Sequence, residues 1–243
     1  MFAAAGCFAV GLCIGWCGVA GFLLPILFVN ACGLSVRESL FLSFLCFAVS
    51  GAIGSANYYR RGEIPLRPSM LLSAASAVGA GIGAAMGGKI PAETAKVILN
   101  LVVLASGAAI LLREFHPGTK GKERVLKAGK LMVLGLLTAV ICALSGAGGP
   151  VLVMPLLVAM GVPARTAVGM ALLDSVFIAL PAIWIYGSGC AVGSFAAVLT
   201  AGVSAHAVGV FLGSRTAAAV PQTMLKRGVA VFSVCFALFM LLK

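Results

Sequence analysis

The sequence has few charged residues, and acidic residues are especially scarce. Only 9% of its 243 residues are charged, with 6 Asp and Glu against 17 Lys and Arg. With 62% hydrophobic residues and a mean hydropathy of +1.16, a soluble core is implausible. Apolar runs of roughly 17–25 residues recur along the whole chain, as in polytopic helical membrane proteins. We expect an all-α polytopic membrane protein with one transmembrane domain, residues 1–243.

Several signatures of enzymes and binding proteins are missing. The chain has no GxxxxGK[ST], HExxH or GxSxG motif, and its eight cysteines form no CxxC pair, which argues against nucleotide, zinc and disulfide chemistry. No Lys or Arg precedes Arg37, so the charged region of a cleaved signal peptide is absent. The basic residues lie in short loops, which indicates membrane topology better than nucleic-acid binding. We expect no cofactor and no metal, and not an enzyme.

One stretch interrupts an apolar run in the middle of the chain. Ser145-Gly146-Ala147-Gly148-Gly149-Pro150 combines residues that weaken or break a helix. A membrane segment of this kind is expected to form two half-helices. The free N–H groups that start the second half-helix must be satisfied at membrane depth by protein, water or a ligand, and an anion is the natural ligand there.

A weaker copy of this pattern lies in the first quarter of the chain, from Trp16 to Leu27. The two copies and the segments after them match at several positions, which are Pro25 with Pro155, the turns 33–37 with 161–165, Tyr58 with Tyr186, Gly83, Gly87 and Lys89 with Gly209, Gly213 and Arg215, and Pro91 and Lys96 with Pro221 and Lys226. The sequence therefore predicts two homologous halves. The repeats are expected at 1–116 and 129–243, joined by a basic linker at 117–128.

Each half reads as a broken segment followed by three spans, expected at 38–59, 69–88 and 94–112 and at 166–186, 192–213 and 223–242. If the broken segments are re-entrant hairpins, thirteen of the 17 Lys and Arg fall on one side of the membrane, whereas full crossings divide them almost evenly. The positive-inside rule favours the hairpins. Three crossings per half then invert the second repeat, with both termini outside and the basic linker in the cytoplasm, an architecture of secondary transporters.

GAGGPVLVMPLL followed by GVPARTAVGMALL, with the weaker N-terminal copy, resembles the sulfite exporter TauE/SafE family. The resemblance covers essentially the whole chain. It implies a multi-pass carrier in the cell inner membrane for sulfonates, sulfite or related organic acids, without a bound cofactor. Two positions depart from the family pattern, since Val19-Ala20 replaces glycine in the first copy and Asp174 stands where small neutral residues are usual.

The two glycine turns are the expected substrate site, because a sulfonate or sulfite offers several acceptor oxygens to N–H groups at a half-helix start. The alternative is that the glycines only let helices pack closely. Ser145 offers a hydroxyl donor or bonds back to its own helix. The expected substrate-binding residues are Trp16, Gly18, Gly21, Arg37, Ser145, Gly146, Ala147, Gly148, Gly149 and Arg165.

Asp174 is the single acidic residue in the interior of an expected span, where a carboxyl group is costly unless it is paired or functional. We interpret it as a proton-coupling residue, with His206 in the next span as its partner; a structural hydrogen bond and a packing histidine are the alternatives. Arg37 and Arg165 occupy equivalent turns, where they either attract anions or snorkel to the interface.

These observations predict a secondary transporter of small anions that works by alternating access, is coupled to protons and lies in contact with membrane lipid. An anion channel, a membrane-embedded enzyme of sulfur metabolism and an accessory subunit remain open. No nucleic-acid partner is expected, and a homodimer is left open.

Overall fold

The computed structural model describes residues 2–18, 20–87, 97, 101, 104, 127–221, 223–224, 227–228, 231 and 234–235. Within these residues all regular structure is helical. Five helices are long and apolar enough to cross a membrane. The expected all-α polytopic fold is confirmed.

The helices fall into two groups along the chain. The first group is α1 (Phe2–Cys17), the short helix η1 (Ala20–Phe22), α2 (Leu23–Cys32), α3 (Val36–Arg60) and α4 (Leu66–Met86). The second group is α6 (Ala128–Ser145), α7 (Gly149–Ala159), α8 (Ala164–Gly187), η3 (Val192–Phe195), α9 (Ala196–Thr216) and η4 (Ala217–Ala219). The expected spans at 38–59, 69–88, 166–186 and 192–213 correspond to α3, α4, α8 and α9. Most residues of the expected spans at 94–112 and 223–242, and nearly all of the linker, lie outside the described residues.

Both broken segments fold back as hairpins. In the first, a Cβ on Gly6 near the start of α1 would stand 2.9 Å from Leu27 Cδ1 in α2. In the second, Leu156 of α7 and Met160, the residue that follows this helix, line one groove with Val133 of α6. With 11 residues, α7 is about 17 Å long, too short to cross a hydrocarbon core of about 30 Å. The hairpins agree with the arrangement that the distribution of positive charge favours.

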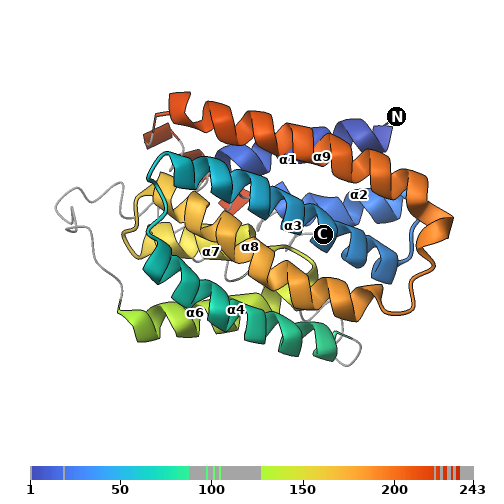
Figure 1. The fold of residues 1–243 in the computed structure, drawn as a ribbon, viewed down its shortest axis with the longest axis horizontal. Coiled ribbons are helices and arrows are strands. Elements are labelled where there is room, and N and C mark those ends of the chain that lie inside the picture. Colours follow the sequence, from blue (N-terminus) through green and yellow to red (C-terminus); the bar gives the residue numbers. More distant parts are fainter. Residues whose placement is uncertain are drawn as a thin grey trace.

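The outer helices of each group pack on helices of the other group. The most extensive packing joins α1 to α9 and α4 to α6, while α3 packs on α8 in the centre. In Figure 1, α3 runs from blue at the right to cyan at the left, and α8 runs from yellow at the left to orange at the right. This reciprocal pairing is what two repeats of opposite direction produce, and it supports the predicted duplication.

Glycines bring the paired outer helices into backbone contact. A Cβ on Gly83 would stand 2.5 Å from Val140 O, and a Cβ on Gly15 would stand 2.6 Å from Ser214 N. These contacts are closer than any real Cβ allows, so the helix pairs can form only without side chains at these positions.

The contacts also shift one detail of the repeat. Gly209 and Gly213 of α9 pack on the carbonyls of Phe8 and Leu12, which stand nine and five residues before the end of α1. Gly79 and Gly83 of α4 pack on the carbonyls of Leu136 and Val140, which also stand nine and five residues before the end of their helix, α6. The spatial counterparts of Gly209 and Gly213 are therefore Gly79 and Gly83, one helical turn away from the Gly83 and Gly87 that the sequence match selects. Glycine at every fourth position makes registers one turn apart look alike.

We expect Gly83→Leu to lower the thermal stability of the purified protein, because the new side chain meets the backbone of α6. Overpacking of this kind costs roughly 1–3 kcal/mol or more. The measurement is the melting temperature in detergent, with Gly129→Leu as control, since Gly129 is also helical and has no atom within 4 Å of its Cβ position. Equal melting temperatures for the two variants would contradict the close helix contact.

Candidate functional site

The two glycine turns meet in the interior. A Cβ on Gly18 would stand 3.4 Å from Pro150 Cβ, and one on Gly21 would stand 3.1 Å from Ala147 O. Gly18, Gly146 and Gly148 have φ angles of 74°, 69° and 74°, a left-handed conformation that favours glycine. Most of the expected substrate-binding residues therefore lie together.

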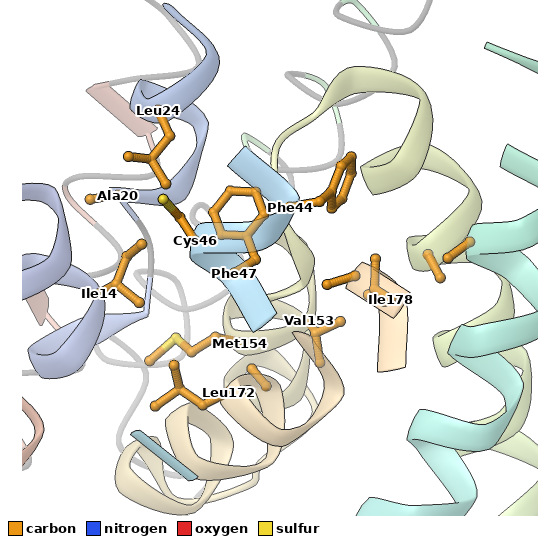
Figure 2. Close-up of a cluster of buried hydrophobic side chains, with 14 of the residues drawn as sticks. Ile14, Ala20, Leu24, Phe44, Cys46, Phe47, Val153, Met154, Leu172 and Ile178 are labelled. Atoms are coloured by element: carbon orange, nitrogen blue, oxygen red, sulfur yellow. The ribbon is translucent and has the colours of Figure 1, made fainter. Parts of the chain in front are cut away.

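Phe47 of α3 lies between the turns. Its ring approaches the Cβ position of Gly21 to 2.7 Å and that of Gly148 to 2.8 Å. Around it, side chains from α1, the first turn, α2, α3, α7 and α8 form one buried cluster (Figure 2). The ring thus fills the space beside both turns, and any ligand held by both turns has to displace it.

The start of α7 lies inside this region. Gly148 is its N-cap and provides no capping side chain, Pro150 is its second residue, and all residues from Gly146 to Pro150 are buried. The hydroxyl of Ser145 donates back to Ile141 O at 2.8 Å. Neither Gly148 nor Ser145 therefore caps the first turn of α7 with a side chain, as the half-helix interpretation requires.

Asp174 of α8 lies at this helix start. A Cβ on Gly149 would stand 3.4 Å from its Oδ2. The residue is fully buried, and neither carboxyl oxygen has a hydrogen-bond partner within the described residues. Ser73 and Ser76 of α4 face the carboxyl, but their hydroxyls do not reach hydrogen-bonding geometry with it.

His206 of α9 is fully buried elsewhere and is not paired with Asp174. Its Nδ1 donates to Cys7 O of α1 at 3.2 Å, and its ring faces the backbone of Cys46 in α3. Its Nε2 makes no hydrogen bond to a described residue. The expected contact between the two coupling residues is therefore absent, because they face different helix pairs.

The two residues nevertheless lie at related places. Asp174 stands twelve residues before Tyr186, and Cys46 stands twelve residues before Tyr58. In the same way, His206 stands three residues before Gly209, and Ser76 stands three residues before Gly79. Both tyrosine hydroxyls donate to a carbonyl two residues before the end of a broken helix, Tyr58 to Gly15 O at 3.2 Å and Tyr186 to Ala143 O at 2.8 Å. By this correspondence Asp174 faces Ser76 in one half where Cys46 faces His206 in the other.

Arg37 and Arg165 lie away from the turns, at helix ends. Arg37 donates to Tyr186 O at 3.1 Å and also to Ser188 O, at the C-terminus of α8. Arg165 donates to Ala218 O at 2.9 Å and Val220 O at 2.8 Å after α9. Both guanidinium groups satisfy carbonyls at helix C-termini, which is a structural role. An additional role in attracting anions stays a prediction.

Trp16 lies at the edge of the site. Its indole Nε1 donates to Thr216 Oγ1 at 2.7 Å, and the side chain is partly exposed. It points to α9, whereas the remaining turn residues lie in the interior.

Three residues at the site were not singled out from the sequence. Phe47 reads as one of many apolar span residues. Ser73 and Ser76 belong to a series with Ser69 in α4, all fully buried. Serines three or four positions apart in an apolar helix share a face, and that spacing was the available signal.

Residues 1–110 match the family model described as Sulfite exporter TauE/SafE. The resemblance to the TauE/SafE family is confirmed over these residues. The matched region contains the first glycine turn, Phe47 and the serines of α4, whereas Asp174 lies beyond it.

The chain is also similar to a protein of Bacillus subtilis (strain 168) named "Probable membrane transporter protein YdhB". The two are 25% identical over 174 residues, which cover 68% of this chain and 70% of that protein. No solved structure gives a significant match. The TauE/SafE match, this relative and the five apolar helices together show a multi-pass membrane transporter, not an enzyme.

We expect Arg37→Lys to lower the melting temperature almost as much as Arg37→Gln, because a lysine ammonium cannot bond several carbonyls in the fixed geometry of a guanidinium. The contact is exposed, so the loss should be about 1 kcal/mol, or roughly 2–4 °C. Arg60→Gln, at the exposed end of the same helix, is the control for loss of charge. Wild-type stability of Arg37→Lys would show that the charge alone matters.

Proposed function

We propose that the protein is a secondary transporter of small sulfur-containing anions of the sulfonate or sulfite class, with its binding site between the two glycine turns. The observation that carries the proposal is the meeting of both turns in the interior, beside the uncapped start of α7. The match to the TauE/SafE family supports the substrate class.

The start of α7 suits an oxyanion. The first N–H groups of a helix have no partner within the helix, and the helix dipole adds partial positive charge there. A sulfonate carries several acceptor oxygens on one sulfur atom, so it can accept from several of these groups together. With glycine at 148 and 149, the side chains of Phe47 and Ile178 lie closest over the backbone, so a ligand reaches it when those side chains move. Phe47, packed over both turns, closes the site when no ligand is bound.

Asp174 supplies the coupling in this proposal. An ionised carboxylate beside the start of α7 repels an anion, whereas a protonated one can donate a hydrogen bond to it. Binding of the anion then favours the protonated form, and a proton moves with the substrate. His206, at the related position of the other half, is a second proton-binding candidate that acts without direct contact to Asp174.

The repeat architecture gives the proposed mechanism. Repeats at 1–116 and 129–243, inverted about the central α3 and α8, allow the site to open alternately to each side of the membrane. Arg61, Arg165 and Arg215 lie toward one end of the molecule, where Arg61 and Arg165 bond to residues 214–220. The positive-inside rule then assigns this end and the basic linker 117–128 to the cytoplasm and the termini to the outside of the inner membrane.

Flux in proteoliposomes tests the function. Vesicles with the purified protein are offered labelled sulfite, a taurine-like sulfonate and sulfoacetate, with carboxylates as controls, at equal and unequal pH across the membrane. The proposal expects saturable flux, exchange of internal for external label, and a faster rate when a pH gradient is imposed. Flux that neither saturates nor exchanges would indicate a channel, and no flux for any sulfur anion would overturn the substrate class.

We expect Gly148→Leu to abolish flux while the protein still folds and inserts. A side chain there must adopt a positive φ and meets the Phe47 ring. Gly62→Leu is the matched control, because Gly62 has a φ of 73° but no atom within 4 Å of its Cβ position. The measurements are the initial rate of labelled sulfonate uptake and the yield of monodisperse protein.

Undiminished uptake in Gly148→Leu would remove the second glycine turn from the site. Equal losses in Gly148→Leu and Gly62→Leu would show a general backbone effect instead.

A further inference from the structure

Ser73, Ser76 and Asp174 place several oxygen atoms without partners in one buried region. All three residues are fully buried. Both carboxyl oxygens of Asp174 and both serine hydroxyls lack hydrogen bonds within the described residues, although the serines on α4 face the carboxyl on α8. Buried polar atoms are almost always satisfied in native proteins, so this group points to a ligand.

The other serines and threonines of these helices show the contrast. Ser69, one turn before Ser73 in α4, donates to Pro65 O at 2.7 Å. Ser175, next to Asp174, donates to Ala171 O at 2.9 Å, and Thr138 of α6 donates to Leu134 O at 2.7 Å. Bonding to the carbonyl one turn earlier is the usual solution for these residues in apolar helices. The hydroxyls of Ser73 and Ser76 make no such bond to their own helix and face Asp174 instead.

Among the described residues, no positive side chain faces the carboxyl of Asp174 to balance its charge. Within the described part of the chain, the sole ion pair joins Arg61 to Glu63, and the facing groups named for Asp174 are hydroxyls, the start of α7 and the thiol of Cys142. The donors at this place are one carboxylate and two hydroxyls, which are hard oxygens with a single negative charge. That set suits a small monovalent cation.

We infer that Asp174, Ser73 and Ser76 form a binding site for one sodium ion. The carboxylate balances the charge of the ion, and the two hydroxyls supply neutral oxygen ligands from the facing helix. The two hydroxyls face the carboxyl from the neighbouring helix, so all three side chains can turn an oxygen toward one small ion.

This inference rests on the proposed function only for its role in transport. Because Asp174 Oδ2 lies at the start of α7, a sodium ion there cancels the repulsion between the carboxylate and an anion held by that helix. Sodium then does what the coupling proton does in the proposal above. By linkage, sodium must raise the affinity for the anion by the same factor by which the anion raises the affinity for sodium.

Thermal stability of the full chain in detergent tests the site. The probe is NaCl, exchanged against choline chloride at constant ionic strength and constant pH, with KCl as a second arm. Sodium at about one hundred times its dissociation constant should raise the melting temperature by on the order of 5 °C. The variants are Asp174→Asn, the double variant Ser73→Ala with Ser76→Ala, and the control Ser69→Ala, a buried serine of the same helix.

The inference expects the sodium effect in the wild type and in Ser69→Ala, and its loss in the other two variants. If Asp174→Asn does not fold, the double serine variant decides, since it leaves the carboxyl in place. The absence of a sodium effect in folded wild-type protein, an equal effect in all variants, or stabilisation by low pH in choline without any effect of sodium would overturn it.

Flux separates this inference from the proposed function. Sodium-dependent stabilisation with no transport of any sulfur anion would support the site and overturn the function. Transport of sulfonate at the same rate in choline and in sodium, with no sodium effect on the melting temperature, would support the function and overturn the site.

Discussion

A helix that is broken inside a bilayer has to find partners for its free backbone groups within the protein, because lipid offers none. This chain breaks two helices, and their turns are buried against each other. Gly18 faces Pro150 and Gly21 faces Ala147 O. The remaining helices follow from this requirement, since α3 and α8 pack in the centre and the outer pairs enclose the hairpins. The same constraint makes the turns a natural place for a ligand.

Backbone contact between helices of different halves holds the enclosure together. Gly15, Gly83, Gly209 and Gly213 let α1 approach α9 and α4 approach α6 to distances that exclude a Cβ. Packing of this kind relies on van der Waals contact, because the hydrophobic effect does little between helices in lipid. Each outer pair contains one helix from each half, so neither half can bury its broken segment without the other.

The two halves that the sequence predicts as repeats carry different chemistry. Asp174 faces Ser76 near the start of α7, while His206 takes the place of Ser76 and lies between Cys7 O and the backbone of Cys46. The first turn also has less glycine than the second. Substrate and cation are therefore proposed to bind mainly to the second half, with Phe47 from the first half closing the site. Ser73 and Ser76, also from the first half, complete the cation site.

The sequence alone determined the helical membrane fold, the four expected spans that correspond to α3, α4, α8 and α9, the breaks at both glycine turns and the presence of a buried acid at Asp174. These follow from local hydropathy, from glycine and proline, and from the cost of charge in lipid, all of which act within a short stretch of chain. Tertiary structure decided what lies opposite each residue. It placed Phe47 over both glycine turns and the hydroxyls of Ser73 and Ser76 opposite the carboxyl of Asp174. It also placed Arg37 and Arg165 at helix C-termini and kept His206 away from Asp174. Such contacts depend on the register and rotation of packed helices. Where glycine recurs at every fourth residue, the sequence cannot distinguish two registers that differ by one helical turn.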